Sequence, residues 1–382
     1  MRDREPHFRT VQTRRDFLQQ MGGAALGAVA LASASAPADL RAAEPGRKIN
    51  FALAGLGMLS TNQIAPALQT TKHCRLAGII TGTPAKVEQW KAKYGIPEKN
   101  IYNYDTMQRM ADNPDIDVVY VVTPNGLHPE HVIKAAQAGK HVLCEKPMAN
   151  SAKDCEAMIA ACRKAGVKLA IGYRCQFEPH NQECIRLARE KTFGELKLIE
   201  ASFGFRVGDP AKFPHIKWRL EKKLAGGGAL MDVGIYALQA TRYLSGEEPV
   251  SVSATETKTD PVKFREVDET ICWTMKFPSG VIANCGTSYN FSGMNRYTAY
   301  AEQGWFGLDP AYGYKGQKGM RSDKQEITFE QVDHFAAEMD DFARCVLDNR
   351  PSRVSGEEGL RDLKVLEAIY KSIATGKSVK LG

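Results

Sequence analysis

The chain has 382 residues, of which 43% are hydrophobic and 25% charged, a composition typical of a globular protein with about two domains. The formal net charge of +7 falls to +5 once residues 1–43, with six basic and four acidic side chains, are set aside. The basic side chains are scattered and form no long run, which argues against a nucleic-acid-binding protein.

Residues 1–43 are predicted to be an export signal with its cleavage region. Arg14-Arg15 is followed by Phe17-Leu18 and by MGGAALGAVALASASA, a weakly apolar run that is too short to span a bilayer. Small residues further on suit cleavage after Ala36 or Ala43. The pattern is typical of a twin-arginine signal, so we expect a periplasmic protein that is exported folded by the twin-arginine machinery and keeps no stable membrane anchor.

Residues 48–174 alternate between strand and helix patterns. Strands are expected at 48–55, 74–82, 116–124, 140–147 and 167–174, and helices at 55–70, 83–95, 128–139 and 151–166. The unbroken apolar run of 116–124 is typical of a strand buried on both faces. This alternation predicts a Rossmann domain with a doubly wound parallel sheet.

Residues 175–382 show a different pattern, in which most predicted strands follow one another without an intervening helix. Strands are expected at 196–207, 250–259, 269–277, 280–291 and 296–308, with helices at 226–244, 333–349 and 357–375. This order predicts an α+β substrate and oligomerisation domain with an open, mostly antiparallel sheet. An open sheet face usually finds a partner, so we expect a homodimer or a higher homo-oligomer.

The nine cysteines are odd in number and include no Cys-x-x-Cys pair. Most of them sit in apolar stretches, as Cys144, Cys272 and Cys285 do. The sequence therefore predicts buried thiols, with neither a disulfide framework nor a metal site.

A glycine turn after the first strand indicates a dinucleotide site. Gly55 permits a tight turn and Gly57 allows a pyrophosphate to approach the helix N-terminus, with the small Ser60 in place of the third glycine. A simple tight turn remains the alternative for such a short motif. At the end of the second strand, Thr81 and Lys86 stand where an NAD site carries an acid, which favours NADP(H). The alternative is that Lys86 is an ordinary exposed helix lysine.

Three polar residues suggest acid–base chemistry. Lys146 lies next to Pro147 at a strand end, and Asp232 and Tyr236 are four residues apart on one helix face. A nearby cation makes a tyrosine usable as a proton relay because it stabilises the phenolate.

Taken with the glycine turn, Glu145-Lys146-Pro147 and Asp232-x-x-x-Tyr236 resemble the signature of the Gfo/Idh/MocA oxidoreductase family. The likeness runs from about 48 to 379 and is strongest to the branch of periplasmic glucose–fructose and aldose–aldose oxidoreductases. It implies that Lys146 contacts the reacting hydroxyl and the nicotinamide, that Tyr236 is the general acid/base, and that Asp232 orients the sugar. The cofactor-binding residues implied are Gly55, Leu56, Gly57, Met58 and Leu59 at the phosphates, Thr81 and Lys86 at the 2′-phosphate, and Thr123, Pro124, Asn125, His128, Glu145, Lys146, Arg174, Trp218 and Arg219 along the cofactor.

The resemblance also implies oxidation of an aldose at C1 to a lactone, followed by reduction of a second sugar by the same tightly bound NADP(H). Only a short arm, ADLRAAEPGR, lies between the signal and the first strand. Glucose–fructose oxidoreductases have a long arm there, so an aldose acceptor fits this chain as well as fructose does. An NAD-dependent glycosidase of the same family and a non-catalytic sugar-binding protein are the alternatives.

Export and a nicotinamide cofactor are compatible if the cofactor never leaves the protein. We therefore expect a ping-pong cycle without added coenzyme, in which one sugar reduces the bound nucleotide and the other oxidises it.

Overall fold

The computed structural model describes residues 46–382, so the predicted signal and its cleavage sites lie outside the described residues. In the described part, one sheet has six parallel strands in the order β3-β2-β1-β4-β5-β6. This is the strand order of a dinucleotide-binding Rossmann sheet, and the predicted fold class is confirmed. The strands are β1 (Ile49–Ala54), β2 (Cys74–Ile80), β3 (Ile101–Tyr102), β4 (Val118–Val121), β5 (His141–Glu145) and β6 (Leu169–Gly172).

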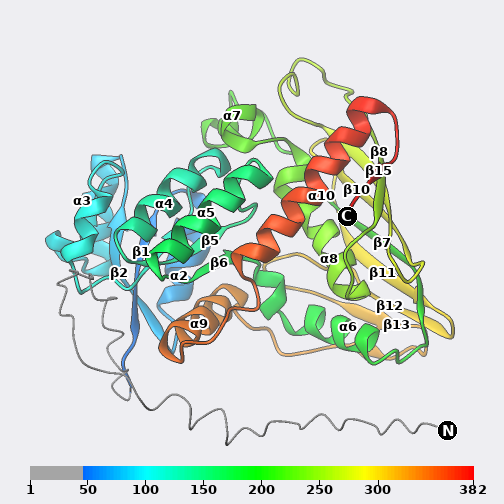
Figure 1. Cartoon of the computed structure of the whole chain (residues 1–382), viewed down its shortest axis with the longest axis horizontal. Helices are drawn as coiled ribbons and strands as arrows, with labels where there is room; N and C mark the ends of the chain where they lie inside the picture. Colours follow the sequence, from blue (N-terminus) through cyan, green and yellow to red (C-terminus); the bar gives the residue numbers. More distant parts are fainter. Residues whose placement is uncertain (1–45) are drawn as a thin grey trace, which may run out of the picture. The chain divides into compact units, whose positions relative to one another are not determined.

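Helices cover both faces of the parallel sheet, as Figure 1 shows. The helices α4 (His128–Gln137) and α5 (Ala152–Ala165) lie side by side on one face, and α2 (Ala65–Leu68) lies on the other. The remaining helix, α3 (Pro84–Tyr94), ends at Gly95, whose φ of +65° is the left-handed conformation expected at a helix stop. Ser151 caps the start of α5, since its hydroxyl accepts a hydrogen bond from Asp154 N at 3.1 Å.

A second sheet of nine strands follows in the order β14-β13-β12-β11-β7-β10-β9-β8-β15. Its neighbours are antiparallel except for β7 and β10, which run parallel. The long strands match the predicted ones: β7 (Leu196–Gly204), β8 (Ser251–Thr257), β9 (Thr270–Lys276), β10 (Ile282–Ser288), β11 (Met294–Ala301) and β12 (Gly304–Leu308). Sequence analysis missed β13 (Gly319–Arg321), β14 (Glu326–Ile327) and β15 (Val379–Lys380), because two or three residues are too few to show an alternating pattern.

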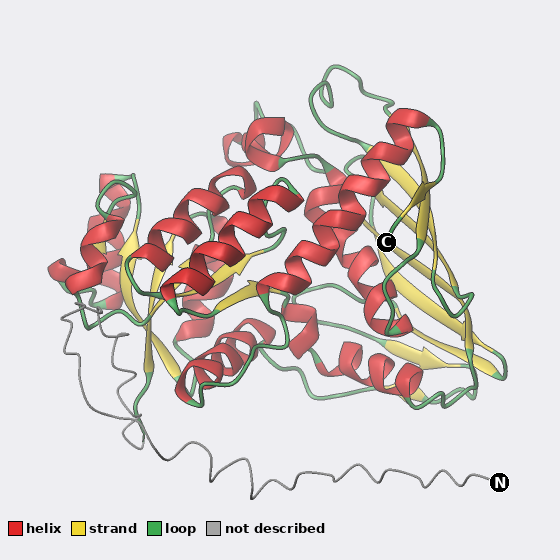
Figure 2. Cartoon of the chain, viewed as in Figure 1, coloured by secondary structure: helices red, strands yellow, loops and turns green. Residues whose placement is uncertain are grey.

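One face of the nine-stranded sheet packs against helices, and Figure 2 shows these helices between the two sheets. They are α6 (Pro179–Arg189), α8 (Ile235–Ser245) and α10 (Gly356–Thr375). Sequence analysis did not predict α6. Glu178 caps this helix, because its carboxylate accepts hydrogen bonds from the backbone N–H groups of the first turn. The short α7 (Lys222–Ala225) precedes α8.

The last helices return to the parallel sheet. The helix α9 (His334–Leu347) packs against β1, β2 and α2, and α10 contacts both α5 and β8. The carboxylate of Asp340 on α9 accepts hydrogen bonds from the backbone of Lys72 and His73, just before β2. Asp340 therefore fixes α9 to the amino end of β2. None of the helices described in residues 46–382 is long and apolar enough to cross a membrane.

Candidate active site at the edge of the parallel sheet

The glycine turn after β1 is closed on one side and open on the other. Gly55 has a φ of +97°, and a Cβ there would lie 2.8 Å from the carbonyl oxygen of Val122. The buried Ser60 hydroxyl donates a 2.5 Å hydrogen bond back to Gly55 O, so this side chain braces the turn. A Cβ on Gly57 would meet no heavy atom within 4 Å. The open side at Gly57, at the start of a helix, fits a bound phosphate.

Two predicted cofactor residues follow β2: Thr81 directly after the strand and Lys86 in the first turns of α3. The Lys86 ammonium donates a 2.7 Å hydrogen bond to Leu56 O, so it lies beside the turn and is only half exposed. Thr81 is buried, and its hydroxyl oxygen accepts a hydrogen bond from Thr83 N at 3.2 Å. Of the other predicted phosphate contacts, Leu56 is buried, Leu59 is half-buried and Met58 is exposed.

Thr123 and Asn125, which follow β4, form one wall of the site and are held in place by hydrogen bonds. Thr123 is buried and its hydroxyl contacts His131 Nδ1 at 3.0 Å, and Asn125 donates a 2.9 Å hydrogen bond to Ala225 O. His128 is completely buried, with Nε2 at 2.7 Å from Thr123 O and Nδ1 at 3.1 Å from Pro147 O. Burial lowers the pKa of His128 to about 4, so it is neutral at pH 7. The structure thus places His128 behind the wall, where it supports the backbone on either side of it.

Glu145, at the end of β5, is buried and faces inward. It accepts a 2.7 Å hydrogen bond from the Tyr120 hydroxyl and a 3.2 Å bond from Lys146 N. Burial raises the pKa of Glu145 and, still more, that of Glu338 on α9, which also contacts the Tyr120 hydroxyl at 3.4 Å. This pair of carboxyl groups joins α9 to the strand end that carries Lys146.

The predicted catalytic lysine and aspartate are in direct contact. The Lys146 ammonium donates to Asp232 Oδ1 at 3.1 Å and to Asp232 O at 2.7 Å. On the other oxygen, Asp232 accepts from Arg219 Nε at 3.2 Å and from the Tyr289 hydroxyl at 2.8 Å. Burial opposes the ionisation of Asp232, but Lys146, Arg219 and Tyr289 outweigh it and hold the pKa of that carboxyl well below its usual range.

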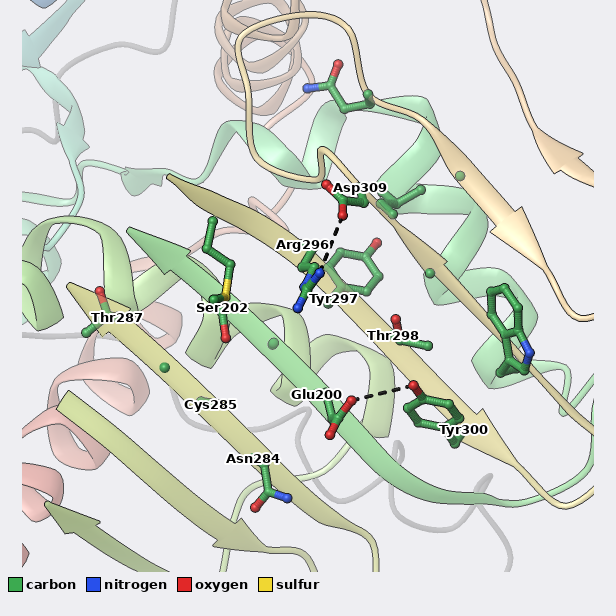
Figure 3. Close-up of a pocket in the computed structure, with 18 of the residues that line it drawn as sticks. Glu200, Ser202, Asn284, Cys285, Thr287, Arg296, Tyr297, Thr298, Tyr300 and Asp309 are labelled. Carbon is green, nitrogen blue, oxygen red and sulfur yellow. Dashed lines mark hydrogen bonds and ion pairs between the residues drawn. The ribbon is translucent and has the colours of Figure 1, made fainter. Parts of the chain in front are cut away.

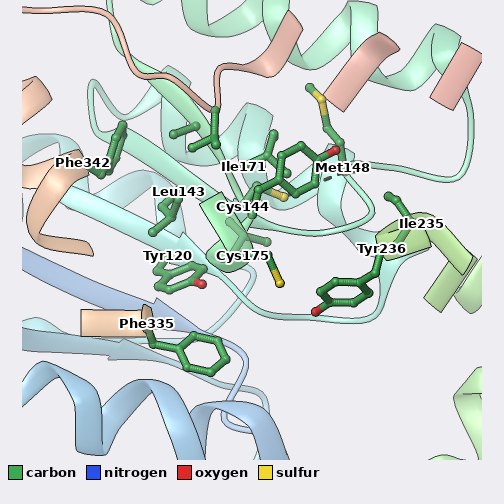
Figure 4. Packing of buried hydrophobic residues seen from close by; sticks show 14 of the residues in the cluster. Tyr120, Leu143, Cys144, Met148, Ile171, Cys175, Ile235, Tyr236, Phe335 and Phe342 are labelled. Atoms are coloured by element: carbon green, nitrogen blue, oxygen red, sulfur yellow. Dashed lines mark hydrogen bonds between the residues drawn. The ribbon is translucent and has the colours of Figure 1, made fainter. Parts of the chain in front are cut away.

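Tyr236 lies one helical turn beyond Asp232, as predicted, and is almost fully buried. Lys146 Nζ and Arg174 Cζ are each 5.0 Å from the centre of its ring. Burial raises the pKa of the Tyr236 phenol above its ordinary value, and the Arg174 charge is the main influence that lowers it. Figure 4 shows the Tyr236 hydroxyl turned toward the side on which Cys175 and Phe335 lie.

Trp218 and Arg219 reach the site on a separate loop. They lie on the 3-10 helix Pro214–Leu220, and the Arg219 guanidinium lies over the Trp218 ring at 4.6 Å. A small hydrophobic cluster holds this loop in place: Val207, Ile216, Ala229, Val233, Phe264, Val267 and Tyr289. The predicted cofactor residue Arg219 is therefore bonded to the predicted catalytic residue Asp232.

Sequence analysis missed several residues of this site. Tyr289 follows β10 and belongs to no sequence motif, yet its hydroxyl donates directly to Asp232. Glu338 and Tyr120 belong to no sequence motif. The Tyr120 hydroxyl contacts both Glu145 and Glu338, and these residues are far apart in the chain. In residues 46–382 no group of three or more His, Cys, Asp or Glu side chains is placed to hold a metal ion.

The geometry fits a nicotinamide dinucleotide. Its phosphates fit the open side of Gly57, and its nicotinamide would lie toward the wall of Thr123 and Asn125 and the strand end at Lys146. A bound nicotinamide supplies hydride transfer, and Lys146, Asp232 and Tyr236 supply hydrogen bonding and proton transfer. A fold that brings these groups to one sheet edge is that of a nicotinamide-dependent oxidoreductase.

Comparison with known proteins agrees with this class. Residues 49–173 match the "Oxidoreductase family, NAD-binding Rossmann fold" and residues 181–307 match the "GFO/IDH/MocA C-terminal domain". The chain belongs to the Gfo/Idh/MocA oxidoreductase family, as its motifs predict.

Three similar proteins illustrate the family. The structure of an aldose–aldose oxidoreductase from Caulobacter crescentus, complexed with glycerol, is 46% identical, covers 88% of this chain and 100% of its own, and has a TM-score of 0.84. A D-xylose 1-dehydrogenase [NADP(+)] from Haloarcula marismortui is 30% identical over 87% of this chain and 93% of its own length. A D-xylose 1-dehydrogenase (NADP(+)) from Haloferax volcanii is 30% identical over 87% and 99%.

The Lys146–Asp232 contact leads to a prediction about stability. Asp232→Asn leaves Lys146 and Arg219 without their shared anion, so we expect the free energy of unfolding at pH 7 to fall by about 3 kcal/mol. Because the folded pKa of Asp232 is below that of the unfolded chain, the contribution is fully present above about pH 4 and decreases as the pH falls further. Urea unfolding of both proteins at several pH values measures the difference.

Asp348→Asn is the matched control, since Asp348 pairs with Arg344 at 3.9 Å on the surface. Its effect should stay within about 0.5 kcal/mol. Equal effects of the two substitutions would contradict this account of Asp232.

Proposed function

We propose that this protein is a periplasmic sugar oxidoreductase that retains NADP(H), oxidises an aldose at C1 to a lactone and reduces a second sugar to an alditol. The observation that carries the proposal is the Lys146–Asp232 pair beside Tyr236, at the same sheet edge as the glycine turn. The relatives support the substrate class, because the similar proteins include an aldose–aldose oxidoreductase and two D-xylose dehydrogenases.

Each of the three residues has a chemical task in this proposal. Lys146 donates two hydrogen bonds to Asp232, and its third N–H can donate to the sugar hydroxyl at the reacting carbon. Asp232 is held in one orientation by three partners, so it can accept a hydrogen bond from a neighbouring sugar hydroxyl in a fixed direction. Tyr236 accepts the proton of the reacting hydroxyl and returns it to the second sugar.

NADP(H) is proposed as the cofactor because of the residues at the end of β2. The Lys86 ammonium lies next to the glycine turn, and no acid follows β2 to bind a ribose 2′-hydroxyl. The two D-xylose dehydrogenases are named as NADP⁺ enzymes, which supports the same choice.

Retention of the cofactor follows from the proposed export. A protein that leaves the cytoplasm through the twin-arginine pathway carries its nucleotide with it and meets no coenzyme pool afterwards. Retention at nanomolar dilution requires on the order of 12 kcal/mol of binding free energy. The short arm before β1 and the similarity to the aldose–aldose oxidoreductase favour an aldose over fructose as the second sugar.

The proposal predicts that the protein isolated from its own compartment turns over without added coenzyme. A first aldose should raise the absorbance at about 340 nm in proportion to the protein, and a second sugar should bleach it, because one bound nucleotide serves both half-reactions. Denaturation should release NADP(H). A transient signal with net hydrolysis indicates the glycosidase, no signal indicates a binding protein, and turnover only with fresh coenzyme contradicts retention.

A second prediction concerns the choice of nucleotide. Lys86→Ala removes the cation proposed to bind the 2′-phosphate, so the dissociation constant for NADPH should rise by about 10- to 100-fold while that for NADH changes little. Fluorescence titration of nucleotide-free protein measures both constants. Lys93→Ala, on the same helix, is the control and should leave both unchanged; an equal loss for NADPH and NADH in Lys86→Ala would contradict the role.

A homodimer across the open face of the nine-stranded sheet is part of the proposal. This face forms a hollow of about 1600 Å³, and Figure 3 shows Glu200, Asn284, Thr298 and Tyr300 along it. Large side chains such as Trp305 and Met320 are partly exposed there, as expected of a surface that a second copy of the chain covers.

The dimer predicts an effect of charge at this face. Trp305→Lys should convert the dimer to a monomer, because an ammonium group would be buried in the interface without a partner. Light scattering measures the mass. Val262→Lys is the control, since Val262 is 87% exposed in a loop away from the hollow. A monomeric wild-type protein would refute the dimer.

A further inference from the structure

Arg174 is an unusual arginine because its charge is buried and unpaired. It follows β6, is 3% exposed, and has no carboxylate oxygen of the described residues within 4.0 Å of its nitrogens. Its other donors meet neutral acceptors, with Nη2 at 2.5 Å from Tyr312 O and Nη1 at 3.0 Å from Gly313 O. The Nε–H has no partner in the described residues. A buried cation without an anion is costly, so its retention calls for an explanation.

The groups in contact with the Arg174 guanidinium do not supply that anion. His334 Nδ1 lies at 3.5 Å, and its Nε2 contacts Tyr314 O at 2.7 Å. Burial, followed by the Arg174 charge, lowers the pKa of His334 to about 4, so this ring is neutral at pH 7. The guanidinium lies over the ring faces of Tyr236, Tyr314 and Phe335 at 5.0, 4.7 and 5.7 Å. Among these rings, only the two tyrosines can become anionic.

We propose that Arg174 is the cation that stabilises the phenolate of Tyr236 during proton transfer. The inference rests on the proposed function and assigns one step of it. As the aldose is oxidised, the C1 hydrogen leaves with two electrons as hydride to the nicotinamide, and the proton of the C1 hydroxyl moves to the phenolate oxygen of Tyr236. A C1–O double bond forms. In the second half-reaction the hydride would pass from the reduced nicotinamide to the carbonyl carbon of the acceptor sugar, and the phenol of Tyr236 returns the proton to the carbonyl oxygen.

Lys146 is the other cation near Tyr236, but it is paired with Asp232, a carboxylate that it shares with Arg219. It is bonded to Asp232 Oδ1 at 3.1 Å, so at Tyr236 the field of the ammonium is opposed by that of the carboxylate. Arg174 has no such ion-pair partner, and burial raises the pKa of the two nearby carboxyl groups, Glu145 and Glu338, which opposes their ionisation. The remaining titratable groups that face Tyr236 are Cys175 and Glu145, whose charges would disfavour the phenolate, and Tyr314. Arg174 is therefore the group that offsets burial at this phenol.

The test is a titration of Tyr236 that does not depend on turnover. A polyfluorinated tyrosine placed site-specifically at position 236 of the nucleotide-loaded protein reports its ionisation through the fluorine resonances, and several ring fluorines are used because burial raises the phenol pKa. Arg174→Met should raise the titration midpoint by about 1 pH unit or more, because the stabilising charge is lost. Arg174→Gln, which keeps a donor for the carbonyls, should raise it similarly, whereas Arg174→Lys should raise it less.

Lys146→Met is the matched comparison, since its ammonium is at the same distance from the ring. It should raise the midpoint less than Arg174→Met does. An unchanged midpoint in both Arg174→Met and Arg174→Gln, or a larger change in Lys146→Met, would overturn the proposal. If the midpoint moves as expected while no sugar reduces the bound nucleotide, the coupling of Arg174 to Tyr236 stands and the proposed function fails.

Discussion

The ion pair between Lys146 and Asp232 is the contact on which the site depends. Lys146 stands at the carboxyl edge of the parallel sheet, and Asp232 stands in the helical segment that packs on the nine-stranded sheet. Burying two opposite charges gains little net stability, but it fixes their geometry. Because Arg219 and Tyr289 bind the second oxygen of Asp232, the pair cannot rotate, and one direction remains for a ligand at Lys146.

The segment that carries Asp232 is held in place by hydrogen bonds to Asp268, a residue without a proposed catalytic role. The carboxylate of Asp268 accepts hydrogen bonds from Gly228 N at 2.6 Å and Leu230 N at 2.8 Å, and the Tyr370 hydroxyl donates to it at 2.6 Å. A Cβ on Gly228 would lie 2.0 Å from Asp268 O, so only glycine allows this approach. The segment Leu230–Gly234 is wound as a π-helix, a local geometry often found at functional sites.

Burial raises the pKa of the Tyr236 phenol and the Arg174 charge lowers it. Neither effect could be predicted from the residues next to Tyr236 in the sequence. Asp232 and Tyr236 were recognisable because four-residue spacing places side chains on one helix face. Arg174, His334 and Phe335 come from distant segments that meet only after the parallel sheet and α9 have packed. For the same reason neither the contact of Tyr289 with Asp232 nor that of Glu338 with Tyr120 was predicted.

The sequence by itself determined the alternation of strands and helices, the glycine turn and the Lys-Pro and Asp-x-x-x-Tyr motifs, because these depend on residue periodicity and on local backbone geometry. It did not show the short strands β13, β14 and β15, whose pairing depends on neighbouring strands rather than on their own pattern. Only the tertiary structure decided which charges are paired. Ion pairing depends on distances of a few ångströms between segments far apart in the chain, and here it pairs Lys146 with Asp232 while leaving Arg174 without a carboxylate within 4.0 Å.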